Sequence, residues 1–160
     1  MAQVDFFLKV DGIEGECQDA YHKGAIQVDS WHWGEIQSIN GSGGGGGAGK
    51  VKMDSFFCSM KHNKASPKLL LACASGDHIK KAKLICRKAG GRPHVFYILT
   101  LTDVLIASYS VSGGEANLIP SEQILINFAA VEWEYFEQKS DGTSGPGVRA
   151  GWNLNTNSAV

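Results

Sequence analysis

Residues 24–58 read GAIQVDSWHWGEIQSINGSGGGGGAGKVKMDSFFC, and the fold is organised around them. A strand-like segment, residues 24–34, leads into a glycine-rich loop, and a second strand-like segment follows at residues 51–59. The consecutive glycines at 43–47 lose more backbone entropy on ordering than any other residues would. Such a loop is either a slack tether or a segment that becomes ordered against a partner, and we expect the second.

The overall composition is that of a folded domain. The 160 residues are 43% hydrophobic and 19% charged, and the formal net charge is −1 at pH 7. A chain of this length buries enough surface to form a core without disulfides or metals. The small net charge gives no whole-protein attraction to nucleic acid or to an anionic membrane. We therefore expect a single domain over residues 1–160.

The cysteines and the first residues indicate a cytosolic folding environment. Cys17, Cys58, Cys73 and Cys86 are widely spaced and form no C-x-x-C pair, so we expect reduced thiols and no zinc site of that type. The N-terminus lacks the basic and apolar regions of a signal peptide, and the apolar runs are too short to cross a bilayer. If the protein leaves the cell, it does so by a route that its N-terminus does not encode.

Alternation of apolar and polar residues predicts a mostly β structure. A change of apolar phase follows Asp103, and a slip near Asp54 predicts a β-bulge. The fold class is therefore all-β: a small, closed or nearly closed β-barrel of two sheets, with roughly six to nine strands and one short flanking α-helix. The expected strands cover residues 4–10, 25–33, 51–59, 81–88, 94–111 and 123–138.

The segments between these strands are expected to be loops. Residues 14–23 are predicted to form an exposed loop that carries Cys17, and residues 41–50 form the extended glycine loop. Residues 148–160 are predicted to be a polar tail that Trp152 pins onto the barrel.

One helix is expected at about residues 66–76. Ser66 is a good N-cap, Pro67 fits the first helical position, and Gly76 supplies a left-handed residue after the end. The helix is apolar nearly all round, and a short helix of that kind is normally buried on more than one side. A neighbouring chain can cover the side that the barrel leaves open. The candidate inter-subunit residues are Lys68, Leu69, Leu70 and Ser75.

Motifs for catalysis fail on inspection. Residues 44–50 match the phosphate-binding pattern G-x-x-x-x-G-K, but Val51 offers no hydroxyl to Mg²⁺ and a strand-like segment follows where a helix is needed. Ser30 and His32 share a strand face, yet no third group is present to orient them. We therefore expect no enzyme activity, no catalytic residue, no cofactor and no metal site.

A basic stretch keeps a second function class open. Residues 78–94 contain no acidic residue, and Phe96 and Tyr97 follow. Basic residues beside aromatic ones can form a face that binds nucleic acid, although a solvated strand face or a contact with a second copy explains them too. The alternative is a monomeric β-barrel binding module for nucleic acid or a small ligand. The cationic residues are Lys80, Lys81, Lys83, Arg87, Lys88 and Arg92.

Several stretches between residues 4 and 153 match one family when taken in order. They are FLKVDGIEGE at 7–16, SWHWG at 30–34, GGGGGAGKV at 43–51, SPKLLLACASG at 66–76, AKL at 82–84, RKAGG at 87–91, NFA at 127–129 and GWN at 151–153. Together they resemble the haemolysin-coregulated proteins, the tube subunits of bacterial type VI secretion. The glycine run with its following AGKV and the preceding Trp-x-Trp-Gly are specific as a pair.

The resemblance implies a structural role in secretion. Family members form hexameric rings that stack into a tube, which a contractile sheath propels and a trimeric spike tips. They leave the cell without a signal peptide after assembly in the cytoplasm, and some carry small effectors inside the ring. The loop at 41–50 is expected to reach the adjacent ring. Its ring-stacking residues are then Gly43, Gly44, Gly45, Gly46, Gly47, Ala48, Gly49 and Lys50.

Two positions depart from the usual family pattern. Cys17 stands where a serine is common, and His32 lies between the tryptophans where a small residue is common. Ser30 and His32 are the expected lumen- or effector-facing residues. A histidine at position 32 would affect which effectors the ring prefers, and it would not affect the formation of the tube.

Overall fold

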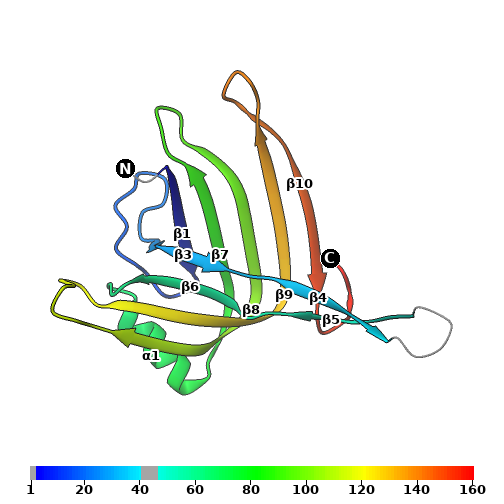
Figure 1. The fold of residues 1–160 in the computed structure, drawn as a ribbon, viewed down its shortest axis with the longest axis horizontal. Coiled ribbons are helices and arrows are strands. Elements are labelled where there is room, and N and C mark those ends of the chain that lie inside the picture. Colours follow the sequence, from blue (N-terminus) through cyan, green and yellow to red (C-terminus); the bar gives the residue numbers. More distant parts are fainter. Residues whose placement is uncertain (1–2, 41–46) are drawn as a thin grey trace.

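The computed structural model describes residues 3–40 and 47–160 (Figure 1). β-Strands dominate this part of the chain, and one helix accompanies them. The elements are β1 (Val4–Val10), β2 (Ile26–Val28), β3 (Ser30–His32), β4 (Glu35–Asn40), β5 (Gly47–Met53), β6 (Phe56–Lys61), α1 (Ser66–Ser75), β7 (His78–Lys88), β8 (His94–Ser112), β9 (Ser121–Gln138), β10 (Ser144–Asn153) and β11 (Ser158–Ala159).

Nine strands form one antiparallel sheet in the order β11-β10-β9-β8-β7-β1-β2, with β6 paired to β9 and β3 paired to β6. Strands β4 and β5 pair only with each other, as a separate two-stranded sheet. The predicted all-β class with two sheets and one short helix is confirmed. The pairings of the described strands do not define a closed barrel.

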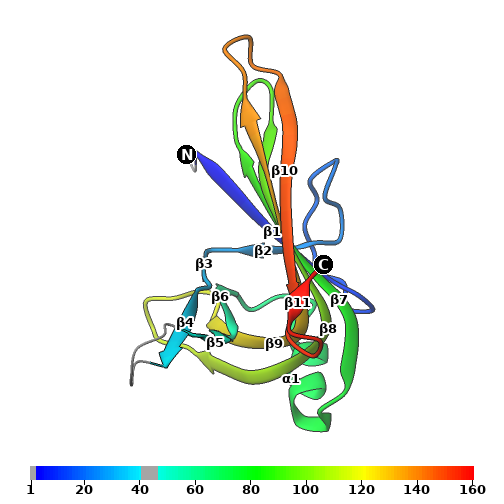
Figure 2. The same ribbon diagram turned by 90° about the vertical axis from the view of Figure 1, so that its right-hand side faces the viewer.

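The two longest strands, β8 and β9, bend and supply both walls of the core. Figure 2 shows the upper parts of β8, β9 and β10 nearly edge-on, with the lower halves of β8 and β9 turning away across the bottom of the molecule. Leu99 and Leu101 are buried before the bend, and Val104 and Ile106 after it. Asp103, with φ of 52°, lies between them. The predicted phase change after Asp103 is confirmed, because a left-handed residue turns the strand over.

The core lies inside this bend. Trp31 stacks on Phe56 and on Tyr97, with ring centroids 6.4 and 5.6 Å apart. Trp33 packs on Trp133 at 5.1 Å. Both tryptophans of the SWHWG stretch therefore pack against the core and help to close it. The largest fully buried side chains include Phe7, Phe56, Leu8, Ile26, Met60, Leu69, Leu84, Leu99, Leu101 and Ile126.

The strand predicted at residues 25–33 is broken in two. Ile26 and Val28 are buried, whereas Ser30 and His32 are exposed, so the two halves of the predicted strand present different faces to the core. The break comes at Asp29, whose backbone N–H donates to the carbonyl of Ser59 at 2.8 Å. The chain pairs with β1 before this point and with β6 after it, and the change of partner turns the strand over.

The glycine loop is shorter than predicted, and the bulge lies elsewhere. Strand β5 begins at Gly47, so part of the expected loop at 41–50 is strand, while residues 41–46 lie outside the described residues. Near Asp54 the chain leaves one sheet for another, which is a strand break and not a bulge. The irregularity in register falls between Gln37 and Ile39, opposite the first half of β5.

The segment predicted to be an exposed loop is partly buried, and much of the predicted tail is strand. Cys17 is buried, because its backbone N–H donates to Ala25 at 3.1 Å and folds the segment back on itself. The predicted tail forms β10, in which Trp152 pairs with Val131 of β9. A mostly polar sequence can form this strand because β10 is exposed over most of its length. Within the described residues, no helix has the length and apolar character to cross a bilayer.

Candidate interaction surfaces

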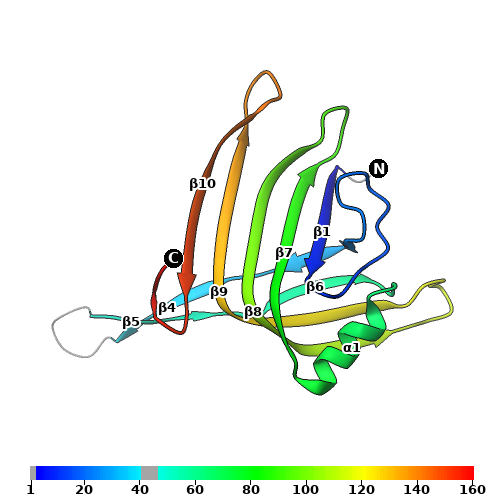
Figure 3. The same ribbon diagram turned by 180° about the vertical axis from the view of Figure 1, so that it is seen from behind.

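Strands β4 and β5 form a hairpin that extends away from the body of the molecule (Figures 1 and 3). Glu35 pairs with Met53 and Ile36 with Lys52. Because side chains alternate across a strand, these two pairs point to opposite sides of the hairpin. We call the side of Glu35 the front face and the side of Ile36 the back face.

The hairpin is fixed near its middle by a close backbone approach. The Ser38 hydroxyl donates to the carbonyl of Lys50 at 2.7 Å. A Cβ atom on Gly49 would collide with the carbonyl oxygen of Ser38. Only glycine fits there, so Gly49 has a structural reason within this chain that is independent of any partner.

The front face of the hairpin and the end of β10 enclose a groove of about 520 Å³. Its floor is aromatic, and polar groups of the hairpin stand at its edge. The volume suits a small ligand or a few side chains of a partner. The lining residues are Glu35, Gln37, Val51, Trp133, Ala150, Gly151 and Trp152.

The helix begins differently from the prediction. Ala65 is the N-cap and makes no side-chain capping bond, while Ser66 is the first helical residue. The Ser66 hydroxyl is buried, accepts from the backbone N–H of Asn63 at 2.8 Å and donates to Glu122 at 2.7 Å. Ser66 therefore anchors the helix to β9 in place of capping it. Gly76 adopts the predicted left-handed conformation, with φ of 71°.

The outer side of α1 is an exposed apolar surface. Leu70 and Leu71 are 51% and 63% exposed, and Lys68 and Ser75 are exposed beside them. Leu69 is completely buried and contributes to the core, so it is removed from the predicted inter-subunit set. Among the described residues, the helix packs mainly against β8 (Figure 3).

A buried carboxylate ties the helix to the sheet. Glu122 is fully buried and accepts from the hydroxyls of Ser66 at 2.7 Å and Tyr109 at 2.6 Å, with His62 Nδ1 at 3.2 Å. Burial, together with the hydrogen bond to Glu122, raises the pKa of Tyr109 to about 12. These partners occupy both carboxyl oxygens of Glu122, since Ser66 contacts Oε1 and Tyr109 and His62 contact Oε2.

Arg87 is not a surface cation. Its guanidinium is nearly buried and pairs with Asp5 at 2.9 Å and Asp19 at 2.7 Å. It also lies over the ring of Phe7, on which His22 stacks. The hydrogen bond from Arg87 lowers the pKa of Asp19 to about 2. Arg87 is thus unavailable to nucleic acid, and the predicted basic face loses one of its members.

Ser30 and His32 are exposed on the same side of β3. The Ser30 hydroxyl lies 2.6 Å from that of Ser59 on the neighbouring strand, and His32 pairs with Phe57 through the backbone. No carboxylate partner of His32 is recorded in the described part of the chain. Both side chains are therefore accessible to another molecule. That they face the central hole of a ring and contact effectors stays a prediction.

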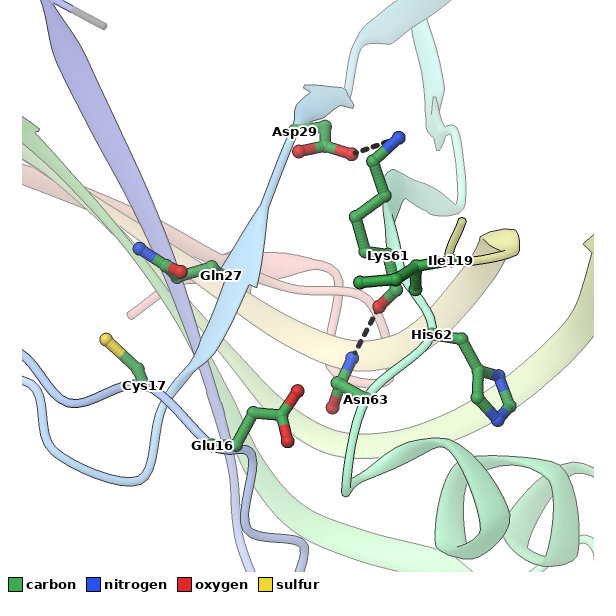
Figure 4. A pocket seen from close by; sticks show the side chains of 8 residues that line it. All are labelled: Glu16, Cys17, Gln27, Asp29, Lys61, His62, Asn63 and Ile119. Carbon is green, nitrogen blue, oxygen red and sulfur yellow. Dashed lines mark hydrogen bonds and ion pairs between the residues drawn. The ribbon is translucent and has the colours of Figure 1, made fainter. Parts of the chain in front are cut away.

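A small polar pocket of about 270 Å³ lies beside the junction of β2 and β3 (Figure 4). In this pocket the Nζ atom of Lys61 lies 3.8 Å from Oδ2 of Asp29. The thiol of Cys17 and the imidazole of His62 stand on opposite sides of the pocket, so they do not form a nucleophile and base. All four cysteines carry free thiols, as predicted. No group of three metal-binding side chains occurs among the described residues.

Comparison with known proteins assigns the chain. A family profile described as "Type VI secretion system effector, Hcp" matches residues 7–135. The chain belongs to the Hcp family. It is 45% identical over 159 residues to the protein hcp1 of Pseudomonas aeruginosa, covering 96% of this chain and 97% of that protein. The predicted family resemblance is confirmed, and the chain is a type VI secretion protein.

Solved structures agree with the Hcp assignment. Hcp1 from Salmonella typhimurium matches with a TM-score of 0.82 and 34% identity, over 99% of this chain and all of that one. A structure described as a type six secretion system protein matches with a TM-score of 0.92 and 29% identity, over 98% and 99% of the two chains. The described strands and helix therefore form the Hcp fold.

Sequence patterns missed two features of this Hcp structure. Glu122 looked like an ordinary polar residue at the start of a strand, and its partners lie 13, 56 and 60 residues away. The groove was missed because β10 was predicted to be a tail. The available signal was the alternation of Val148, Ala150 and Trp152, which is weak because small residues and glycines separate them.

Proposed function

We propose that the chain is the structural subunit of the type VI secretion tube. Six copies form a ring, rings stack into a tube, and a contractile sheath expels the tube with a spike protein at its tip. The observation that carries this proposal is the whole-length match to an Hcp protein, 45% identical over 159 residues. The match covers 96% of this chain and 97% of that protein.

Exposed apolar surface supports self-assembly. Leu70 and Leu71 lie on the outer side of α1, and a soluble single chain gains nothing from leaving them in water. A head-to-tail contact that closes gives a ring, and a second contact along the axis gives an open stack. We assign the α1 surface, with Lys68 and Ser75, to contacts within the ring.

Stacking is assigned to the hairpin and to the glycine run of the sequence. The proposed stacking residues are Gly43–Lys50, of which Gly47 to Lys50 lie in β5. The hairpin extends beyond the body of the chain, where it can reach another ring (Figure 1). The tube forms in the cytoplasm and is then secreted.

Effector carriage is assigned to the central hole of the ring. Ser30 and His32 are exposed on β3 and offer a hydroxyl and an imidazole to cargo. The chain acts as a conduit and carrier of small effector proteins and not as an enzyme. Its partners are further copies of itself, the spike, the sheath and those effectors.

The mass of the purified protein tests this proposal. Size-exclusion chromatography with light scattering should give six times the chain mass of 17.2 kDa. Electron micrographs should show rings with a central hole. A monomer mass at every concentration would contradict the proposal and favour a monomeric binding module, the second class predicted from the basic stretch.

The glycine run tests the stacking role separately. Replacing Gly43–Gly47 with alanines should leave the hexamer mass unchanged and shorten or abolish stacks, because alanine narrows the backbone conformations that contact with another ring requires. Tube length is measured in electron micrographs against the parent protein. Tubes of equal length would remove the loop from the stacking contact.

A further inference from the structure

The groove between the hairpin front and β10 carries charge of one sign. Of the lining residues that the structure describes, Glu35 alone is charged, and no ion pair of Glu35 occurs in the described part of the chain. Two cations on the same strands are directed elsewhere: Lys52 lies on the back face with Ile36, and Arg149 is bound to Glu134 at 2.7 Å. The groove therefore favours a positively charged molecule.

Two tryptophans supply the aromatic part of the groove. Trp133 is backed by Trp33, whose ring centroid lies 5.1 Å away. Because Trp133 pairs with Ala150, Trp152 is its diagonal neighbour on the same face of the sheet. The buried indole N–H of Trp152 has no acceptor among the described residues, so packing alone holds this ring. One ring is thus supported from behind, and the other is free to adjust around a bound molecule.

The groove offers few hydrogen-bond acceptors to a cation. Its side-chain acceptors are the carboxylate of Glu35 and the amide carbonyl of Gln37, both on the hairpin at the edge. A primary ammonium brings three N–H donors, and burying a donor without an acceptor is costly. A trimethylammonium group has no N–H to satisfy, and aromatic faces attract it through their quadrupoles. The lining therefore suits a quaternary ammonium better than a primary one.

We propose that this groove binds a small soluble molecule with a quaternary ammonium head. The head lies against Trp133 and Trp152, and Glu35 balances its charge from the edge. The volume of about 520 Å³ falls within the range of small-molecule sites. Every lining residue comes from one chain, so the site is a property of the protein beyond the proposed tube and does not depend on ring formation.

Calorimetric titration of the full-length protein with choline chloride tests the site. The matched probe is the uncharged alcohol in which a tert-butyl group replaces the trimethylammonium group, since the two molecules share a shape and differ in charge. Choline should bind about tenfold more tightly than this alcohol. Ethanolamine, which carries a primary ammonium, should also bind more weakly than choline. Equal concentrations of sodium chloride control for ionic strength.

Substitutions locate the binding in the groove. Glu35→Gln changes an exposed side chain, so the fold should persist, and choline affinity should fall about tenfold while binding of the uncharged alcohol stays the same. Glu115→Gln removes an exposed carboxylate outside the groove lining and should leave choline affinity unchanged. Trp152→Leu should abolish choline binding, whereas Trp152→Phe should retain it, because the second variant keeps an aromatic face.

The outcomes separate this inference from the proposed function. Absence of choline binding, equal binding of choline and the uncharged alcohol, or binding that Glu35→Gln leaves unchanged would each overturn the inference. Binding to phosphatidylcholine vesicles without binding to free choline would assign the groove to a membrane surface and overturn it as well. Light scattering on the same sample reports assembly. A monomer that binds choline would contradict the proposed function alone, and a hexamer that does not bind choline would contradict the inference alone.

Discussion

Arg87 has a different role in the structure from the one that its sequence context predicts. In sequence it belongs to a run of exposed cations, and in the fold its side chain is only 10% exposed between Asp5 and Asp19. The carboxylates come from β1 and from the segment before β2, so no local pattern predicts the pairing. The ion pair holds that segment, with Cys17, against the sheet.

Removing this cation should destabilise the fold. Arg87→Met leaves two carboxylates facing each other in a partly buried site, and we expect the free energy of unfolding to fall by about 2–3 kcal/mol. Urea denaturation measures the change. Arg149→Met is the matched control, because Arg149 is 63% exposed where it pairs with Glu134, and its loss should lower the free energy of unfolding far less. Equal effects of the two variants would contradict a buried role for Arg87.

His22 should make stability depend on pH. Burial lowers its pKa from the ordinary value of 6.5, and the positive charges of Lys9 and Arg87 lower it further, against the opposing carboxylates. The unfolded chain then binds a proton first as the pH falls, so stability holds above about pH 6.5 and declines below it. The urea midpoint should be lower at pH 5 than at pH 7.

The control for this pH dependence is His22→Phe. Phenylalanine keeps the stacking on Phe7, whose ring lies 4.3 Å from that of His22, and it does not titrate. The difference between the midpoints at pH 7 and pH 5 should shrink in this variant. An unchanged difference would show that other groups carry the dependence.

At the scale of elements, α1 depends on a partner far away in sequence. Its apolar composition and the glycine after its end predict its position, and the structure places it at Ser66–Ser75. How the helix is attached to the sheet was not predicted. The Ser66 hydroxyl donates a hydrogen bond to Glu122 of β9 and does not cap the backbone at the start of the helix. A capping signal and a tertiary hydrogen bond use the same residue type.

Loss of the Glu122 carboxylate should loosen the helix. Glu122→Ala leaves the buried hydroxyl of Ser66 and the half-buried hydroxyl of Tyr109 without their acceptor, so we expect a loss of about 3 kcal/mol in the free energy of unfolding. Amide hydrogen exchange in residues 66–75 should accelerate more than exchange in β7. Exposed Glu115→Ala serves as the control, with both measurements unchanged. Exchange that accelerates uniformly would argue against a local anchor.

At the scale of the whole molecule, assembly should depend on the α1 surface. Leu71→Asp changes a side chain that is 63% exposed, so the fold should survive and the far-ultraviolet circular dichroism should not change. Light scattering should then report monomers in place of rings, because a charge is costly to bury in an apolar contact. Val160→Asp, at a residue 66% exposed near the end of the chain, should leave the ring mass intact. A hexameric Leu71→Asp would remove the helix from the ring contact.

The fold class, the helix and the phase change after Asp103 were predictable because they depend on neighbours in sequence. Alternation reports burial on one face, and glycine and proline report backbone conformation. The same local information established the Hcp resemblance, since the glycine run and the Trp-x-Trp-Gly stretch are continuous. Structural features that depend on residues a few positions apart can therefore be predicted from the sequence.

The break at Asp29, the pairing of Arg87, the anchor at Glu122 and the groove beside β10 were not predictable. Each depends on which distant strand a segment meets, and alternation is the same whichever partner is chosen. Burial of a charged residue likewise follows from packing among remote elements. Local sequence patterns thus determined most of the strands, the helix and the family resemblance. Long-range pairing alone placed Arg87 and Glu122, changed the buried face at Asp29 and shaped the surfaces proposed for assembly.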